Sequence, residues 1–333
     1  VPLTGDNRRI VRQGMMALNM GYTTKGLAKL MEKCKINMYS TSKDFSFYLI
    51  PCINAPGRLI DDGSIKSVQA IWCNNDNAEK LTDELIEINN RRKQIVSGLL
   101  EQADMENTKR NMEKAAILYL PKAPEGVAGL IAGRLAEKTG KPSIAMVCTK
   151  EGIIKGSCRY QEEDLHLKHA LDQCQELLLK YGGHQKAAAF SLQKENLEAF
   201  KKRFEACCPE CRCEDAVYYD IEINAFDIPE VLKQLEYMQP FGEGNPEPVF
   251  LIRNIKPGDL FGQKYSYFGE NDSHVRIHFK SFRATGFFMG ERFKNEDMEE
   301  YPYIDIMGYL NINHHNGRSY QQMKLIDFRK SDI

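Results

Sequence analysis

The chain has 333 residues, of which 42% are hydrophobic and 27% are charged, and its formal net charge is -1. It is long enough for two or three domains, and it contains neither a run of 18 apolar residues nor a signal-peptide pattern, which argues against a membrane span and against secretion. Because the net charge is close to zero, any contact with nucleic-acid phosphates has to come from local basic patches.

The first 75 residues have the pattern of the tail of an α/β domain. Helices are predicted at residues 8–20 and 24–33, and a strand at residues 45–50. The strand leads into the loop Asn54-Ala-Pro-Gly-Arg58, whose Pro-Gly turn would hold the Arg58 guanidinium away from the backbone. A planar guanidinium suits bidentate recognition of a phosphate. A structural salt bridge is the alternative role for this arginine.

The stretch from Asn77 to about Met112 predicts one long amphipathic helix. It has no proline and one glycine, Gly98. Its apolar residues recur at alternating four- and three-residue steps, and they are Leu81, Leu85, Ile88, Ile95 and Leu99. A helix of this length would extend for roughly 50 Å, enough to connect two domains. Two shorter helices broken near the glycine are the alternative.

Strands and helices alternate from residue 113 to 213, which predicts a small α/β domain. The predicted strands are 115–120, 143–148, 152–158 and 187–192, and the predicted helices are 124–139, 164–181 and 196–207. In the first of these helices Gly126, Gly129 and Gly133 recur at three- and four-residue steps. This spacing indicates close packing of the helix on the sheet, because the G-x-G-x-x-G order of a phosphate-binding loop is absent.

The third predicted strand of this domain contains Lys155-Gly-Ser-Cys-Arg159. Side chains two residues apart on a strand share a face, so Ser157 and Arg159 would lie together while Cys158 turns inward. A hydroxyl beside a guanidinium can bind a phosphate. A structural salt bridge is the alternative for Arg159.

The segment Tyr181-Gly-Gly-His184 follows the predicted helix at 164–181. Gly182 and Gly183 can adopt a positive φ and let the backbone approach a phosphate closely. The turn would then hold the His184 imidazole at the lip of a cleft. An ordinary end of a helix is the alternative.

The ten cysteines are scattered along a chain that is too large to need disulfides, which fits a reducing cytoplasm. Four of them are close together: Cys207, Cys208, Cys211 and Cys213. The second and third have the C-x-x-C spacing of zinc ligands. No second pair follows at a suitable distance, so a reduced helix end and linker is favoured over a metal site.

From residue 214 to residue 333 the pattern is rich in strands and has one early helix, which predicts an OB-fold-like barrel. Residues 258–272 and 289–301 are rich in glycine, charge and turn formers and are predicted to be loops. The predicted strands are 217–224, 249–255, 274–282, 304–312 and 321–328.

The strand His274-Val-Arg-Ile-His-Phe-Lys280 alternates strictly between apolar and basic residues. Its apolar residues would face the barrel interior, which leaves a basic stripe on the outer face, formed by His274, Arg276, His278 and Lys280. Tyr309 and Tyr320 on neighbouring strands could supply aromatic platforms for bases. A groove for a single strand of nucleic acid and a plain solvated face both fit this pattern.

Four of these segments, taken in chain order, resemble motifs of the RecJ family of single-strand-specific DNA exonucleases, which belongs to the DHH superfamily. They are Ile53-Asn-Ala-Pro-Gly-Arg-Leu59, Lys155-Gly-Ser-Cys-Arg159, Tyr181-Gly-Gly-His-Gln-Lys-Ala-Ala-Ala-Phe190 and Pro240-Phe-Gly-Glu-Gly-Asn-Pro-Glu-Pro248. The resemblance spans nearly the whole chain but only the latter part of such a protein. Ala189 departs from the family pattern, which commonly has glycine there.

The resemblance implies a division of the chain into four parts. Residues 1–75 would be the C-terminal part of a DHH catalytic domain, and residues 76–112 a connecting helix. Residues 113–213 would be a DHH-associated α/β domain that binds substrate, and residues 214–333 a single-strand-binding domain.

The resemblance also implies roles for individual residues. Arg58, Ser157 and Arg159 would lie near the 5′-phosphate of the strand, and His184 would reach toward the metal centre and the scissile phosphate. The family uses Mn²⁺ or Mg²⁺, but its Asp-His-His motif occurs nowhere in this sequence. We therefore assign no metal ligand to this chain and expect it to be inactive alone.

The function implied is that of a metal-dependent 5′→3′ exonuclease that hydrolyses single-stranded DNA in repair and recombination. A non-catalytic module related to RecJ is one alternative, and an enzyme for short oligoribonucleotides or small phosphoesters is another. The expected partner is the 5′ end of single-stranded DNA, with a helicase or single-strand-binding protein in the complete system. No membrane contact is expected. Whether the chain is a fragment or the product of a split gene stays open.

Overall fold

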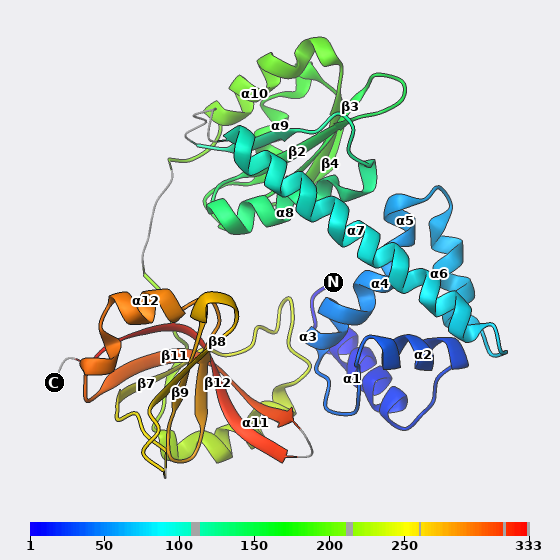
Figure 1. The fold of residues 1–333 in the computed structure, drawn as a ribbon. Coiled ribbons are helices and arrows are strands. Elements are labelled where there is room, and N and C mark those ends of the chain that lie inside the picture. Colours follow the sequence, from blue (N-terminus) through cyan, green and yellow to red (C-terminus); the bar gives the residue numbers. More distant parts are fainter. Residues whose placement is uncertain (108–113, 211–215, 260, 316–317, 332–333) are drawn as a thin grey trace. The chain divides into compact units, whose positions relative to one another are not determined.

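The computed structural model describes residues 1–107, 114–210, 216–259, 261–315 and 318–331 (Figure 1). The chain forms two compact units. Thr23–Asn37 and Asp44–Glu214 form the first, which we call the helix-sheet unit. Val1–Tyr22, Met38–Lys43 and Asp215–Ile333 form the second, which we call the strand-rich unit.

Short helices dominate the chain before residue 75. They are α1 (Gly5–Asn19), α2 (Lys25–Lys33), α3 (Ser42–Asp44), α4 (Ile50–Asn54), α5 (Pro56–Leu59) and α6 (Gly63–Trp72). The two helices predicted from the sequence in this region are confirmed as α1 and α2. In the helix-sheet unit α2, α4 and α6 pack on α7 around a core that includes Leu30, Leu49 and Leu85.

The strand predicted at residues 45–50 is wrong, because Phe45–Leu49 forms a π-helical turn that continues into α4. The aromatic residues Phe45, Phe47 and Tyr48 favour a strand by local preference alone. Burial follows a helical spacing instead, since Leu49 and Cys52 are buried three residues apart while Phe47 and Tyr48 are exposed. Packing against α7 therefore decides the conformation of this segment.

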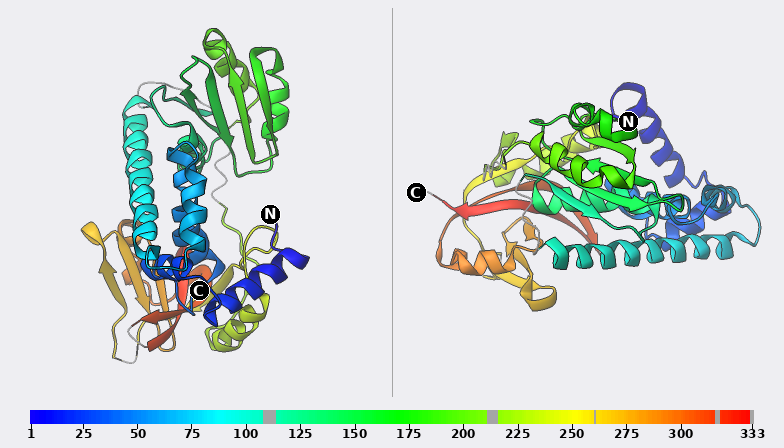
Figure 2. Two further views of the ribbon diagram at one scale, coloured as in Figure 1. Left: turned by 90° about the vertical axis from the view of Figure 1, so that its right-hand side faces the viewer. Right: turned by 90° about the horizontal axis from the view of Figure 1, so that it is seen from above.

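The long helix predicted after residue 76 is confirmed as α7 (Ala78–Asn107). Figure 2 shows it as one continuous helix. Gly98 lies within its bounds and does not interrupt it. The predicted end at residue 112 lies outside the described residues. Its first half packs on α2, α4, α5 and α6, and it also contacts α8. Within its unit, α7 thus connects the short helices to the sheet.

The helix-sheet unit contains a five-stranded sheet with the order β1-β2-β3-β5-β4. The strands are β1 (Ala116–Tyr119), β2 (Ser143–Cys148), β3 (Ile154–Arg159), β4 (Leu178–Gly183) and β5 (Ala187–Leu192). Only β1 and β2 are parallel. Helix α8 (Ala128–Thr139) covers one face, and α9 (Leu167–Asp172) and α10 (Leu197–Ala206) cover the other.

The predicted strands β1, β2, β3 and β5 and the predicted helices α8 and α10 are confirmed, but the helix predicted at residues 164–181 is confirmed only for Leu167–Asp172. Helix α9 ends at Asp172, and Leu178–Gly183 form the edge strand β4, which pairs with β5 as an antiparallel hairpin. The run Leu177-Leu-Leu-Lys180 has high helix propensity. Its pairing with β5 overrides that local preference.

The strand-rich unit is built on a seven-stranded sheet with the order β6-β7-β11-β12-β10-β9-β8. The strands are β6 (Ile221–Glu222), β7 (Phe250–Ile255), β8 (Tyr265–Phe268), β9 (His274–His278), β10 (Arg283–Gly286), β11 (Ile304–His315) and β12 (Arg318–Lys330). The helices are α11 (Ile228–Met238) and α12 (Gly290–Asn295). They enclose one apolar core together with the inner face of the sheet.

Three predicted strands of this unit are confirmed as β7, β11 and β12. The strand predicted at 274–282 is confirmed only for β9, which ends at His278; the chain then bends around Lys280 and returns as the antiparallel strand β10, which begins at Arg283. The predicted loops at 258–272 and 289–301 are wrong in part, because they contain β8 and α12. The strand β8 is short and lies between Gly262 and Gly269, so turn formers dominate its sequence window.

The motif Pro240-Phe-Gly-Glu-Gly-Asn-Pro-Glu-Pro248 forms a turn that holds the beginning of the chain. The Leu3 amide donates to the Glu243 carbonyl oxygen at 2.6 Å. Within the turn, Asn245 Nδ2 donates to the carbonyl oxygens of Met238 at 2.9 Å and Pro240 at 3.0 Å. In the part of the chain that the structure describes, no helix is both long and apolar enough to cross a membrane.

Candidate nucleic-acid interface

Part of one face of the five-stranded sheet is left open beside α8. Ser157 on β3 pairs with Ala189 on β5, which in turn pairs with Gly182 on β4. Arg159 pairs with Ala187 in the next row. Ser157 and Arg159 are half-buried and Cys158 is fully buried, which confirms the predicted alternation. The result is a strip of small side chains bordered by a hydroxyl and a guanidinium.

The Arg159 guanidinium lies against the first turn of α8. A Cβ atom on Gly129 would lie 2.9 Å from Arg159 Nη2 and 3.7 Å from Ser157 Oγ, so only glycine leaves this space free. Arg159 Nη1 donates to the carbonyl oxygen of its neighbour Cys158 at 2.7 Å. Burial, and to a lesser extent the nearby Arg58, lowers the pKa of Arg159. The guanidinium is therefore partly desolvated, and binding of an anion would stabilise its charge.

Arg58 is brought to the same end of α8 by its own short helix. Its Nη1 donates to the Gly126 carbonyl oxygen at 3.1 Å. Gly126 packs directly on the backbone of Arg58, because a Cβ there would lie 2.3 Å from the Arg58 carbonyl oxygen. The predicted Pro-Gly loop is thus a helical turn, α5, that docks on the segment preceding α8.

The glycines of this region differ from the role that the sequence suggested. They were expected to bring α8 close to the sheet. Instead Gly126 and Gly129 approach the two arginines, and a Cβ on Gly133 would have nothing within 4 Å. Two of the three glycines therefore shape the arginine site.

Two further arginines, which sequence reasoning missed, extend this site. Burial, followed by the charges of Arg58 and Arg134, lowers the pKa of Arg92 on α7. The Arg92 Nε atom is buried and has no hydrogen-bond partner in the part of the chain that the structure describes. Among the described residues, none of Arg58, Arg92, Arg134 and Arg159 forms an ion pair with a carboxylate. We call these four residues the arginine cluster, and its uncompensated charge favours an anionic ligand.

The Gly-Gly-His segment lies at the end of a strand and not at the end of a helix, which corrects the prediction. Gly183 has a φ of 149°, and a Cβ there would lie 2.4 Å from Ala188 Cα, so the hairpin requires glycine. The His184 amide donates to the Ala187 carbonyl oxygen at 2.8 Å. The His184 side chain is exposed beside the row that contains Arg159. The structure thus places Gly182, Gly183 and His184 at the edge of the open strip.

The strand-rich unit presents the predicted basic strand in a different way. Val275 and Ile277 are fully buried in the core, as predicted. The continuous stripe is wrong, because His278 is only 6% exposed and its Nε2 lies 2.9 Å from Ser266 Oγ. Burial is the main cause that lowers the pKa of His278. Lys280 lies past the end of β9, in the bend that leads to β10.

Basic and aromatic side chains alternate on the outer face of this sheet. Arg276 lies 4.8 Å from the ring centre of Phe268, and Arg283 lies 4.8 Å from that of Tyr320. Lys324 lies 5.6 Å from the Phe287 ring, and it shares a row with Arg276 through Thr285. His274 packs edge-on against three phenylalanines: Phe268, Phe287 and Phe288. We call this surface the cation-aromatic face.

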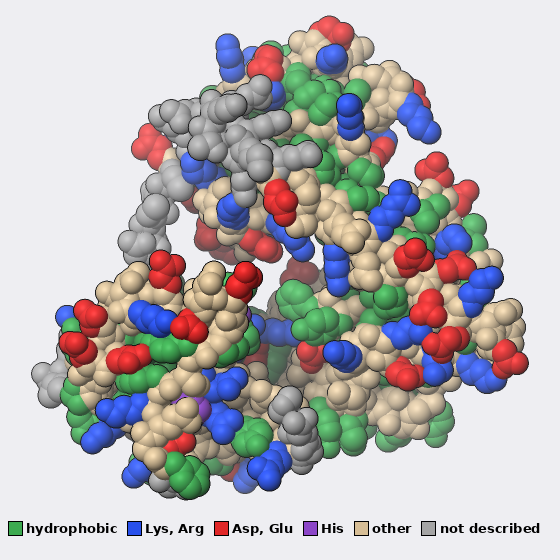
Figure 3. Space-filling model, viewed as in Figure 1, with side chains coloured by type: hydrophobic (Ala, Val, Ile, Leu, Met, Phe, Trp, Pro, Cys, Tyr) green, Lys and Arg blue, Asp and Glu red, His purple; other side chains and the backbone are tan. Residues whose placement is uncertain are grey.

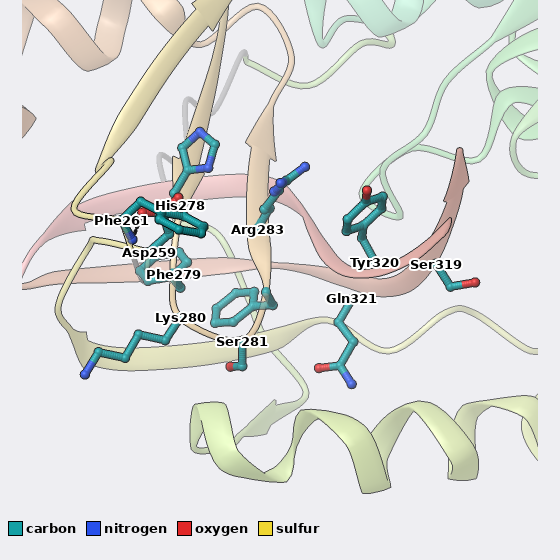
Figure 4. A pocket seen from close by; sticks show the side chains of 11 residues that line it. Asp259, Phe261, His278, Phe279, Lys280, Ser281, Arg283, Ser319, Tyr320 and Gln321 are labelled. Atoms are coloured by element: carbon teal, nitrogen blue, oxygen red, sulfur yellow. Dashed lines mark hydrogen bonds between the residues drawn. The ribbon is translucent and has the colours of Figure 1, made fainter. Parts of the chain in front are cut away.

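A pocket of about 390 Å³ opens on this face. Figure 4 shows Arg283 and Tyr320 on neighbouring strands with their side chains directed toward one another, and Phe261 and His278 on the other side of the pocket. Lys and Arg side chains also gather around a histidine on the strand-rich unit in Figure 3. The second predicted aromatic platform, Tyr309, is covered by Lys43 Nζ at 4.4 Å from its ring centre.

The described residues offer no ready site for a metal ion. No group of three His, Cys, Asp or Glu side chains lies close enough together among them. Of the four clustered cysteines, Cys207 and Cys208 are described as free thiols. Cys211 and Cys213 lie outside the described residues.

Comparison with known proteins gives matches along most of the chain. The model of the DHHA1 domain matches residues 113–210, and the model of the RecJ OB domain matches residues 219–327. The single-stranded-DNA-specific exonuclease RecJ of Thermus thermophilus is 30% identical over 346 residues, which cover 99% of this chain and 46% of that protein. The RecJ of Dickeya dadantii is 32% identical over 266 residues, 75% of this chain and 46% of the relative.

Solved structures give the same result. Crystal structures of Thermus thermophilus RecJ in complex with Mg²⁺ and with Mn²⁺ each align with a TM-score of 0.80 at 28% sequence identity. These alignments cover 100% of this chain and 50% and 48% of the RecJ chains. The chain therefore spans about half the length of the relatives it matches.

Proposed function

The chain belongs to the RecJ family, of which it represents a C-terminal portion, and we propose that it is the substrate-binding part of a 5′→3′ exonuclease that acts on single-stranded DNA. The observation that carries this proposal is the convergence of Arg58, Ser157 and Arg159 on the glycine-lined end of α8. These three side chains border an open strip of small residues that a DNA strand can approach.

We assign the three side chains to the terminal 5′-phosphate of the strand. An exonuclease has to distinguish an end from an interior phosphodiester, and the end carries an extra negative charge and additional free oxygens. Two guanidiniums and a hydroxyl match these acceptors. The absence of a carboxylate paired with either arginine in the described part of the chain supports this assignment, because the charges remain available to a ligand.

We assign His184, with Gly182 and Gly183, to the strand beyond the terminal phosphate. The histidine side chain is exposed next to the row of Ala187 and Arg159, and a neutral or protonated imidazole can donate a hydrogen bond to a phosphate oxygen. The flat strip formed by Gly182 and Ala189 admits the backbone of a strand without steric hindrance. The glycine that the family commonly has at position 189 is replaced by the next smallest side chain.

Hydrolysis would require groups that the described residues do not supply. The solved relatives contain Mg²⁺ or Mn²⁺, and no set of ligands for such an ion exists among the described residues of this chain. The apolar side chains Ile65, Val68 and Trp72 are more than half exposed on one face of α6. A surface of this kind is typical of an interface with further polypeptide. We therefore propose that this chain binds DNA and that cleavage needs additional protein.

The cation-aromatic face of the strand-rich unit is proposed to hold more distant nucleotides. An OB fold binds a single strand through a basic groove and through aromatic rings on which bases stack. The pairs Arg283–Tyr320 and Arg276–Phe268 provide both elements. If the complete protein proves unable to cleave DNA, the same surfaces would serve a non-catalytic single-strand-binding module, which is the second candidate function.

Binding of end-labelled oligonucleotides tests the proposal. The purified chain should bind a single strand with a 5′-phosphate more tightly than the same strand with a 5′-hydroxyl, and it should release no nucleotides with Mn²⁺ or Mg²⁺ present. The affinity should decrease steeply with salt, because phosphate neutralisation releases counterions. Equal affinity for the two ends would contradict the end-binding role. Metal-dependent nucleotide release, absent from a mock purification, would contradict the need for additional protein.

A further inference from the structure

Two thiols face each other among the short helices of the helix-sheet unit. The Sγ atoms of Cys34 and Cys52 lie 3.6 Å apart. Cys34 follows the last residue of α2 and is half-buried, whereas Cys52 lies in α4 and is 2% exposed. Both are free thiols. Since a disulfide bond is about 2.05 Å long, the two sulfurs need to approach by roughly 1.5 Å to form one.

Three polar residues of α7 act on this pair. Asn89 Nδ2 lies 3.1 Å from Cys52 Sγ, although Asn89 is only 3% exposed and its Oδ1 has no hydrogen-bond partner among the described residues. Arg92 and Lys93, almost one turn further along α7, act on the same sulfur by their positive charges. A buried amide donor and two cations around one sulfur favour its thiolate form.

The proton of the pair is held unequally. The hydrogen bond from Cys34, followed by the charge of Lys93 and the donor group of Asn89, lowers the pKa of Cys52 to about 7. The same hydrogen bond raises the pKa of Cys34. When the pair loses one proton, the negative charge therefore lies mainly on the Cys52 sulfur, which shares the remaining proton with Cys34 across their contact.

We propose that Cys34 and Cys52 form a redox-active dithiol that a peroxide converts to an intramolecular disulfide between α2 and α4. In the first step the Cys52 sulfur, as the thiolate, attacks one peroxide oxygen. The S–O bond forms, the O–O bond breaks, and the leaving hydroxide takes the Cys34 proton to give water. The Cys34 thiolate then attacks the Cys52 sulfur, the S–S bond forms, and the S–O bond breaks to release hydroxide, which takes a proton from solvent. The peroxide is reduced by the two electrons that the thiols lose.

The cysteine pair is linked to the arginine cluster by the chain and by electrostatic interaction. The segment that holds Cys52 continues directly into α5, which carries Arg58. Arg92 acts both on the Cys52 sulfur and on Arg58. Disulfide formation would tether this segment to α2 and remove the negative charge beside Arg92. The thiol state of the pair is thereby coupled to the segment that presents Arg58.

A second pair of cysteines in the same unit provides an internal control. Cys174 and Cys207 are also neighbours, since Cys207 is among the groups that raise the pKa of Cys174. Burial raises the pKa of Cys174 to about 12 and also raises the pKa of Cys207. Thiols of this kind remain protonated near neutral pH and are poor nucleophiles. The two pairs therefore differ in reactivity although both consist of neighbouring thiols.

The test is limited oxidation of the full chain with hydrogen peroxide at pH 7, followed by alkylation under denaturing conditions, proteolysis and mass spectrometry. A species that joins the peptides of Cys34 and Cys52, about 2 Da lighter than their sum, should form at least about tenfold faster than one that joins Cys174 and Cys207. It should disappear on reduction. Cys34→Ser and Cys52→Ser should each abolish it.

Asn89→Asp separates the proposed role of the amide from simple proximity. This substitution preserves the size of the side chain but replaces the donor by an acceptor, so disulfide formation should slow by about tenfold. The variant's circular dichroism has to match that of the parent for this comparison. Oxidation that joins Cys174 and Cys207 first, or that yields only sulfinic and sulfonic acids at Cys52, would overturn the proposal.

Discussion

The substitution Gly129→Ala tests the geometry of the proposed phosphate site with a single added methyl group. Its Cβ would lie 2.9 Å from Arg159 Nη2, whereas ordinary contacts are 3.4–4 Å, so the guanidinium has to shift by at least about 0.5 Å. Charge-assisted hydrogen bonds are about 2.7–2.9 Å long, and the shift lengthens at least one of them beyond useful range. Losing one such bond costs about 1.5–3 kcal/mol, which corresponds to roughly a ten- to hundredfold loss of affinity for the 5′-phosphate.

Gly133→Ala is the matched control on the same helix. A Cβ at this position has nothing within 4 Å. Both substitutions replace a glycine inside α8 and should favour the helix by about 1 kcal/mol, so neither should reduce the thermal stability of the chain. Only the atom that displaces Arg159 distinguishes the two variants.

The assay is fluorescence anisotropy at low salt with a single strand of about ten nucleotides, labelled at its 3′ end and carrying either a 5′-phosphate or a 5′-hydroxyl. Gly129→Ala should lose affinity for the phosphorylated strand and retain its affinity for the hydroxyl strand. Gly133→Ala should behave like the parent with both. If both variants bind the phosphorylated strand as the parent does, the Arg159 guanidinium does not contact the phosphate and the reasoning fails.

Three further predictions concern the two units separately. Arg58→Ala and Arg159→Ala should each remove most of the preference for a 5′-phosphate, by about ten- to a hundredfold, and an unchanged ratio of the two affinities in both variants would make these arginines structural. Tyr320→Ala should weaken binding of strands longer than about ten nucleotides by ~1–3 kcal/mol. Phe226 is an exposed aromatic residue outside the pocket, so Phe226→Ala should have no effect on this binding. Equal losses of affinity in the two variants would exclude a stacking role for Tyr320. Burial keeps the pKa of His278 lower in the folded protein than in the unfolded chain, so the unfolded state binds more protons and the free energy of unfolding should decrease as the pH falls below about 6.5. In urea unfolding, the free energy of unfolding of His278→Asn should decrease less steeply with falling pH than that of the parent. The same pH dependence in both proteins would contradict the assignment.

The sequence predicted those elements in which apolar residues recur at the regular spacing of a helix or a strand. The apolar spacing from Leu81 to Leu99 in α7 and the alternation along β3 are both regular, so the sequence alone specifies these two elements and the buried face of β3. The alternation also predicted that Ser157 and Arg159 share a face and that Cys158 is buried. The placement of Ser157 beside Arg159 could therefore be predicted from the amino-acid sequence.

The remaining errors have one cause, which is that tertiary contacts overrode local preference. The π-helical turn at Phe45–Leu49 is decided by packing on α7, and β4 exists because β5 offers it a hydrogen-bonding edge. His278 lies on the predicted face of β9, but Ser266 on the neighbouring strand β8 covers it. A pattern within one strand contains no information about which strand lies beside it.

The glycines near α8 show what the sequence predicted about the site and what it could not. The three- and four-residue spacing of Gly126, Gly129 and Gly133 indicated a close approach, but not to what. Their partners come from α5 and β3, which are 68 and 30 residues away in the chain. Gly129 admits Arg159 and Gly126 admits Arg58 at the same end of α8, so the two guanidiniums repel each other, and an anion between them would relieve that repulsion. A purely structural role would leave that repulsion uncompensated, whereas a bound phosphate converts it into affinity.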